Sequence, residues 1–222
     1  MRLAQTGHEI DFYLPFPDKH LKSPHPNIRL IEVAKSDLRP YFSLSKKGRL
    51  ASYGENLLKA VDMYAKIAGE LVAAEHAKKP YDVLHAHDWL VAKSAITASK
   101  KIKRAVVQTI HSTEYDRTSL PWEVILDIER LAVRDATLVI AVSKRTAEQV
   151  KRLGGDGKKI RVVYNGVDSS KYKNNAYPPQ LVSSAKKGKK VLFLGRLTEQ
   201  KGPVQFLHAA KKVLDKNKDV MF

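Results

Sequence analysis

Short runs of valine, leucine and isoleucine alternate with amphipathic helical segments along most of the chain, and this alternation restricts the fold more than any other feature. Strands that are apolar throughout are typical of a parallel sheet with helices on both faces. In such sheets, ligands bind beyond the carboxyl ends of the strands. We therefore expect an α/β fold whose functional residues directly follow its strands. The expected strands are Glu9–Leu14, Ile28–Val33, Asp82–Ala86, Ala105–Ile110, Thr137–Val142 and Ile160–Tyr164.

The segments between these strands carry helical periodicity and recognisable end signals. In the longest of them, apolar side chains recur every three or four residues, which predicts one buried face. Ser143 is a good N-cap, and Gly154–Gly155 is a good C-terminal stop. The expected helices are Asn56–Lys78, Trp89–Ser99, Trp122–Arg134 and one from Ser143 to Leu153.

Composition excludes several classes of protein. The chain has 222 residues, of which 43% are hydrophobic, enough for a sizeable core in one domain or in one domain with part of another. It has no cysteine, which excludes disulfides and zinc–thiolate sites. No apolar run reaches the length of a membrane span, and the N-terminus does not have the pattern of a signal peptide. We therefore expect a cytoplasmic protein.

The net charge of +17 has two interpretations. Clustered cations attract polyanions such as nucleic acid or anionic lipid. We favour a solvated surface without a partner, because aromatic residues do not alternate with the cations as base stacking requires. Specific nucleic-acid binding is therefore not expected, and peripheral contact with an anionic membrane stays an alternative. The clusters are Lys100–Arg104, Lys158–Arg161 and Lys186–Lys190.

Polar residues follow three of the expected strands. His85, His87 and Asp88 lie at the end of the strand Asp82–Ala86. Two histidines two residues apart on a strand share a face. The pattern of a His-rich metal site is incomplete, however, so no metal site is expected. Asp88 either caps the next helix or accepts hydrogen bonds from a hydroxylated substrate, and spacing alone does not choose. His111 and Glu114 follow the strand Ala105–Ile110 and could serve acid–base chemistry or bind sugar hydroxyls. Taken by itself, His111 is more simply explained as a hydrogen-bonded structural histidine.

Asn165–Gly166 follows the last of these strands and predicts a tight turn, because this pair adopts positive φ easily. The pair alone gives no function.

A further segment combines an apolar strand from Val191, a turn at Gly195, the cations Arg196 and Lys201, and a helix opened by Pro203. Helix N-termini favour anions, and two cations beside one can hold a diphosphate. A glycine-rich P-loop is absent. Residues Ser169–Lys190 lack periodicity and are expected to be a linker.

Together these motifs resemble a known family. Their order and spacing resemble the retaining GT-B glycosyltransferases of the glycogen/starch synthase-like superfamily, of the family 4 (group 1) type. The resemblance implies a Rossmann-like parallel sheet with helices on both faces over residues 1–168, a linker at 169–190, and the first strand–helix unit of a second Rossmann-like domain over 191–222. The segments are His85–Trp89, Thr109–Ser112, Ser143–Lys144, Tyr164–Asp168 and Phe193–Pro203.

The resemblance also implies roles for individual residues. Arg196 and Lys201 would bind the diphosphate of a nucleotide-sugar donor and stabilise the leaving charge without a metal ion. His111 would contact the transferred sugar. The acceptor, a carbohydrate or lipid, would lie on the first domain near His87 and Asp88, and Asn165 and Gly166 would face the cleft between the domains. No cofactor is implied beyond the donor substrate.

The chain departs from the family pattern at both ends. It is expected to begin after the family's first strand and Gly-Gly loop and to stop before its paired glutamates, so the 222 residues alone are expected to show little or no turnover. Two alternatives remain: a non-catalytic basic module that binds a membrane, nucleic acid or partner protein, and a related epimerase or phosphorylase.

Overall fold

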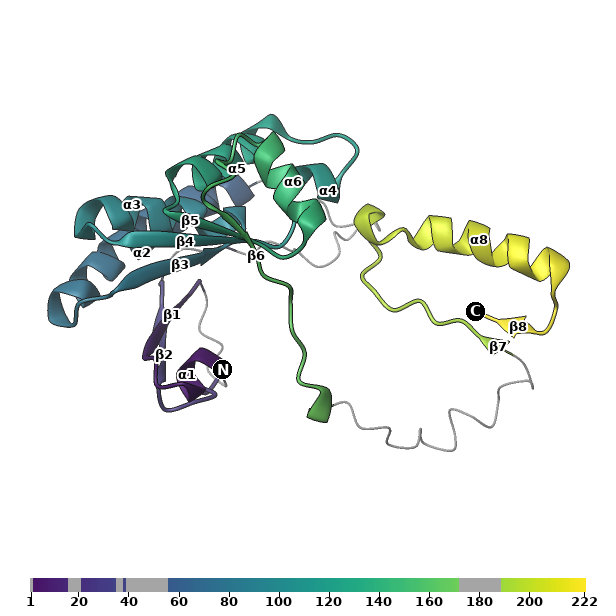
Figure 1. The fold of residues 1–222 in the computed structure, drawn as a ribbon, viewed down its shortest axis with the longest axis horizontal. Helices are drawn as coiled ribbons and strands as arrows, with labels where there is room; N and C mark the ends of the chain where they lie inside the picture. The colour runs from purple at the N-terminus through teal and green to yellow at the C-terminus, as the bar shows by residue number, and fades with distance from the viewer. Residues whose placement is uncertain (1, 16–20, 35–37, 39–55, 172–188) are drawn as a thin grey trace. The chain divides into compact units, whose positions relative to one another are not determined.

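The computed structural model describes residues 2–15, 21–34, 38, 56–171 and 189–222 (Figure 1). The chain forms two compact units. The first consists of Met1–Tyr115 and Ser119–Tyr164, and the second of Asp116–Thr118 and Asn165–Phe222. The sequence placed the end of the first domain at residue 168, and most of the expected linker, 172–188, lies outside the described residues.

The first unit is built on parallel strands, as expected. Four of them form one sheet in the order β3-β4-β5-β6, and two form a second sheet, β1-β2. The prediction of a parallel, Rossmann-like α/β fold is confirmed. The strands are β1 (Ile10–Leu14), β2 (Ile28–Glu32), β3 (Val83–His87), β4 (Ala105–Ile110), β5 (Leu138–Ala141) and β6 (Ile160–Val162).

Helices lie between these strands near their expected positions. One expected helix differs, because Trp89–Val91 forms a 3-10 turn, η1, before the α-helix begins at Ala92. A short helix, Glu114–Arg117, was not expected. The helices of this unit are α1 (Arg2–Gln5), α2 (Leu57–Lys78), α3 (Ala92–Ile102), α4 (Glu114–Arg117), α5 (Glu123–Asp135) and α6 (Lys144–Arg152).

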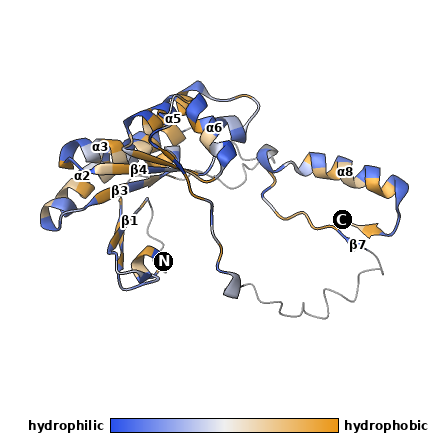
Figure 2. Ribbon diagram, in the orientation of Figure 1, coloured by the Kyte–Doolittle hydropathy of each residue, from blue (hydrophilic) through white to orange (hydrophobic). Residues whose placement is uncertain are grey.

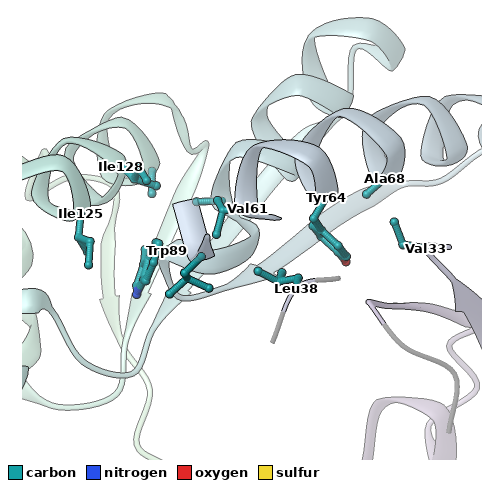
Figure 3. Close-up of a cluster of buried hydrophobic side chains, with 11 residues drawn as sticks. Val33, Leu38, Val61, Tyr64, Ala68, Trp89, Ile125 and Ile128 are labelled. Atoms are coloured by element: carbon teal, nitrogen blue, oxygen red, sulfur yellow. The ribbon is translucent and has the colours of Figure 1, made fainter. Parts of the chain in front are cut away.

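The apolar faces of these helices form two buried clusters. The first joins α2, η1 and α5, and Figure 3 shows its side chains around Trp89, which is 3% exposed. The second lies between the four-stranded sheet and helices α3, α5 and α6. Figure 2 shows the result as apolar strands β3 and β4 beside helices with one apolar and one polar side. The sheet side chains in the second cluster are Leu84, Val106, Ile110, Val139 and Ile160.

Local signals set the ends of α6. Ser143 Oγ accepts a hydrogen bond from the Thr146 N–H at 3.0 Å, which confirms the predicted N-cap. At the other end, Gly154 has φ +90°, and its N–H donates to Lys151 O. The Gly155 N–H donates to Val150 O at 3.0 Å, which completes a Schellman motif.

A polar network joins β1 and β2 to the start of β3. The Tyr81 hydroxyl hydrogen-bonds the Asp11 carboxylate and lies 2.8 Å from the Tyr13 hydroxyl. Arg29 pairs with Asp11 and, at 2.7 Å, with Glu75 of α2. The guanidinium of Arg29 is the main cause of a lowered Asp11 pKa, because its hydrogen bond favours the carboxylate form.

The second unit is small. It contains two short parallel strands that pair with each other, β7 (Lys189–Lys190) and β8 (Val220–Met221). The helix α8 (Pro203–Lys216) lies between them in the sequence. The sequence predicted the first strand from Val191, but strand pairing covers Lys189–Lys190 and ends with the hydrogen bond from Val191 N–H to Met221 O. The predicted strand began too far along the chain, because the lysines of β7 lack the apolar character that predicts a strand. The apolar residues Leu192 and Leu194, which favoured the later start, lie exposed beyond the paired residues.

Candidate functional site

The carboxyl ends of β3 and β4 carry most of the residues that the sequence singled out in the first unit. The strands are parallel and in register, with His87 opposite Thr109. Residues that follow the two strands are therefore neighbours in space, although they are more than twenty residues apart in sequence. This register places Asp88 beside His111.

Three imidazoles form a row across these strand ends. The rings of His85 and His87 stack, with centroids 4.5 Å apart. His87 Nδ1 lies 3.1 Å from His111 Nε2, so one nitrogen donates a proton and the other accepts it. His85 Nε2 lies 2.7 Å from the Thr109 hydroxyl. The expectation that His85 and His87 share a face of the strand is confirmed.

Two imidazoles of this row, those of His85 and His87, have lowered pKa values. Partial burial of the rings lowers the pKa of both His85 and His87, and the facing imidazoles lower it further. Two protonated rings could not keep the contact between His87 and His111, because both nitrogens would carry protons. The lowered pKa values favour the neutral forms of His85 and His87, and a neutral imidazole can both donate and accept a hydrogen bond.

Asp88 neither caps the helix nor leaves both carboxylate oxygens available to a substrate. Its side chain makes no capping hydrogen bond to η1. Instead, Asp88 Oδ1 accepts the backbone N–H of His111 at 2.7 Å. The interpretation of Asp88 as a helix cap is therefore wrong, because register brings a nearer donor from β4. Asp88 fastens the two strand ends together.

Sequence reasoning missed the buried Glu129 of α5, and it did not predict that Glu114 would be buried. The two carboxylate oxygens of Glu129 accept the backbone N–H of Glu114, each at 3.0 Å. Glu129 and Glu114 are each 1% exposed, and Glu114 Oε1 accepts the Trp122 N–H at 3.4 Å. Glu129 thus anchors the segment that follows His111. A charged residue on the apolar face of α5 was the signal that could have identified it.

Asn165 and Gly166 belong to the second unit. The predicted tight turn with positive φ is wrong, because neither residue has positive φ and the segment runs without a turn. An Asn-Gly pair tolerates positive φ but does not enforce it. A functional role for this pair stays a prediction.

The second unit contains the loop that the sequence marked for a diphosphate. Its helix α8 begins at Pro203 as predicted, after Gly202 with φ +66°. Carbons of the Lys201 side chain pack within 4 Å of the position that a Cβ on Gly195 would occupy. Backbone hydrogen bonds from Thr198 N–H to Arg196 O and from Lys201 N–H to Thr198 O close the loop. Arg196 and Lys201 are both exposed, so the loop presents two cations before a helix N-terminus.

Several basic clusters have partners of their own. Lys101 pairs with Glu70, and Lys100 lies 3.5 Å from Asp135. Lys159 donates to the carbonyl oxygens at the end of α5, and Arg104 donates to Tyr81 O at 2.7 Å. These cations serve local structure, which weakens the interpretation as a polyanion-binding module.

The part of the chain that the structure describes holds no cluster of three or more His, Asp and Glu side chains arranged for a metal ion. No helix in the same ranges is long and apolar enough to cross a membrane.

Comparison with known families gives one match over most of the chain. The model described as Glycosyltransferase Family 4 matches residues 1–171. Glycogen synthase of Mycobacterium tuberculosis is 27% identical over 214 residues, which are 90% of this chain and 49% of that protein. An uncharacterised glycosyltransferase of Methanocaldococcus jannaschii is 30% identical over 148 residues, which are 62% of this chain and 38% of that protein. The chain thus spans about half the length, or less, of these relatives.

Solved structures show the same fold. Sucrose-phosphate synthase from Thermosynechococcus elongatus aligns over 95% of this chain and 51% of its own, with a TM-score of 0.70 and 20% identity. HepE of Anabaena, in a complex with UDP and glucose, aligns over 96% of this chain and 60% of its own, with a TM-score of 0.61 and 18% identity.

Proposed function

The chain belongs to glycosyltransferase family 4, and from that premise we propose that it takes part in sugar transfer from a nucleotide-diphosphate sugar to a carbohydrate or lipid acceptor. We further propose that transfer retains the anomeric configuration and uses no metal ion. The solved complex of HepE with UDP and glucose supports the class of donor. The acceptors named for the relatives differ, so the proposal stays at the level of the class.

The observation that carries this proposal is the Gly195–Pro203 loop. A departing nucleoside diphosphate develops negative charge, which a transferase must stabilise with a metal ion or with cations of its own. Arg196 supplies a planar donor pair and Lys201 a compact charge, and both precede the N-terminus of α8. The two cations thus take the role that a metal has in other transferases.

The first unit supplies the remaining roles, except for that of Asn165 and Gly166 in the second unit. His111 contacts the transferred sugar through its imidazole. His87 hydrogen-bonds His111 and lines the acceptor side, while Asp88 holds the His111 backbone. Asn165 and Gly166 are proposed to face the substrates.

Nucleotide binding tests the assignment without requiring turnover. Titration calorimetry with UDP, ADP and GDP, each against its monophosphate, should show that the diphosphate is preferred. We expect Arg196→Ala and Lys201→Ala each to weaken diphosphate binding by about 10- to 150-fold, since a hydrogen bond to a charged group contributes about 1.5–3 kcal/mol. Monophosphate binding should change less.

Lys212→Ala is the matched control, because Lys212 is an exposed lysine on α8 whose removal changes the net charge equally. If all three variants bind alike, the diphosphate assignment is wrong and the affinity reflects only the overall charge.

A further inference from the structure

Asp88 adopts a backbone conformation that aspartate rarely tolerates. Its φ is +57° and its ψ is −175°, in a region used almost only by glycine. The other described non-glycine residue with positive φ is Lys103, which ends α3 in the ordinary left-handed conformation. Conformations such as that of Asp88 persist only where the surroundings enforce them.

Three hydrogen bonds enforce it, and all of them come from β4 or its end. The Asp88 N–H donates to Thr109 O at 2.9 Å. Gln108 Nε2 donates to Asp88 O at 3.1 Å, and the His111 N–H donates to Asp88 Oδ1 at 2.7 Å. Both peptide groups of Asp88 and its carboxylate are thus tied to the neighbouring strand.

Gln108 is the unexpected member of this set. It is 0% exposed and shares a face of β4 with Val106 and Ile110, which pack in the apolar cluster. Its Oε1 is buried and has no hydrogen-bond partner in the part of the chain that the structure describes. The reverse amide orientation would place Oε1 against the carbonyl oxygens of Asp88 and Thr109, so Nε2 must face them.

An amide is an unfavourable choice for this position. A buried acceptor without a partner destabilises the fold, whereas an apolar side chain of the same shape would avoid the penalty. What Gln108 offers and an apolar residue does not is the Nε2 donor to Asp88 O. The amide therefore stabilises the strained turn rather than the core.

We propose that Gln108 is a positioning residue, whose amide holds the Asp88 turn and, through Asp88, sets the His87–His111 hydrogen bond. Without the amide, Asp88 relaxes to negative φ, its carboxylate leaves the His111 N–H, and the two imidazoles separate. The bearing of this device on sugar transfer rests on the proposed function. The geometric claim does not.

Nuclear magnetic resonance of the histidine side chains in the full 222-residue chain tests the proposal. In the wild type, the ¹⁵N shifts of His87 Nδ1 and His111 Nε2 should report a hydrogen-bonded pair. In Gln108→Met they should take the values of separate imidazoles. The pKa of His87, lowered first by burial and then by the facing His111, should rise as that imidazole moves away. His85 and Asp88 also face His87 and influence its pKa. The variants His87→Gln and His85→Gln show which imidazole signal belongs to which histidine.

Gln149→Met is the matched control, because Gln149 lies on α6 and also has a buried Oε1 without a partner among the described residues. We expect both methionine variants to fold with an unchanged or higher denaturant midpoint, and only Gln108→Met to alter the imidazole signals. Unaltered signals in a folded Gln108→Met chain would overturn the proposal.

Gln108→Leu guards against a packing failure of methionine. If both the leucine and the methionine variants fail to fold, Gln108 is a structural residue and the proposal is also overturned. The proposed function has a separate test, the nucleotide titration of Arg196→Ala and Lys201→Ala. If these variants bind diphosphates as Lys212→Ala does, the proposed function fails, and that result does not affect the imidazole signals.

Discussion

Replacing Asp88 by alanine and by glycine separates its two contributions to stability. Both substitutions remove the carboxylate that accepts the His111 N–H. A hydrogen bond to a charged group contributes about 1.5–3 kcal/mol, so Asp88→Ala should lower the free energy of unfolding by that amount. Alanine keeps a Cβ at φ +57°, so the backbone strain remains.

Glycine removes the strain together with the hydrogen bond. Relief of a backbone conformation of this kind returns about 1–3 kcal/mol. The greater freedom of glycine in the unfolded chain offsets about 0.4–1 kcal/mol of this gain. We therefore expect Asp88→Gly to be more stable than Asp88→Ala by roughly 1 kcal/mol, the reverse of the usual order of these residues.

Denaturant unfolding followed by tryptophan fluorescence measures these differences. Both tryptophans lie in the first unit, and Trp89, 3% exposed, directly follows Asp88. The free energy is extrapolated to water, and equal slopes confirm that the variants unfold from comparable states.

Asp156 provides the matched pair of controls. Its carboxylate also accepts a backbone N–H, that of Lys158 at 2.9 Å, but its φ is negative. At Asp156, glycine should be no better than alanine. If glycine is also no better than alanine at Asp88, the strain argument is refuted.

Three further predictions concern other parts of the first unit. Gly155→Ala should lower the denaturant midpoint, because the added Cβ would lie 2.9 Å from Val150 O. Gly157→Ala is the control and should stay within about 0.5 kcal/mol of the wild type, because a Cβ there would have nothing within 4 Å. Equal midpoints for the two variants would contradict the packing at the end of α6. As the pH decreases, the unfolded chain protonates His85 and His87 before the folded chain does, because folding lowers their pKa values. The contribution of these histidines to the free energy of unfolding should therefore be fully present above about pH 6.5 and decrease below it. The double variant His85→Gln/His87→Gln should flatten this pH dependence, and an unchanged slope would exclude these histidines as its cause. Tyr81→Phe should lower stability by about 1–2 kcal/mol in thermal unfolding, since it deprives Asp11 and Tyr13 of a hydroxyl partner, whereas Tyr164→Phe, at an exposed tyrosine, serves as the near-neutral control.

Local signals were sufficient for most elements of the fold, although not for η1, α4 and β7. The 3.6-residue periodicity predicted α2, whose buried face includes Val61, Tyr64 and Ala68 as expected. The Ser143 cap and the Gly154–Gly155 stop predicted the two ends of α6, because both act over three or four residues of the same segment. Where a signal was permissive, prediction failed. The Asn165–Gly166 pair allows a turn that the chain does not make.

The residues of the candidate site were also visible in the sequence, because they follow the ends of strands. Their roles were not visible. In the sequence, the helix after Asp88 was a possible local partner, and spacing alone could not exclude a cap that the structure does not show. Its actual donor, the His111 N–H, lies 23 residues away and becomes a neighbour only through the pairing of β3 with β4.

The sequence by itself thus determined the class of fold, the order of its elements and the family, since periodicity, end signals and motif order are properties of contiguous segments. Only the tertiary structure decided which groups meet: the paired imidazoles of His87 and His111, the strained Asp88, and the buried Gln108 and Glu129. The physical reason is strand register. Side chains point to alternate faces of a strand, and a shift of one residue between β3 and β4 would change the partners of His87, Asp88 and Gln108. The contact of Glu129 depends in the same way on how α5 packs against the segment after β4.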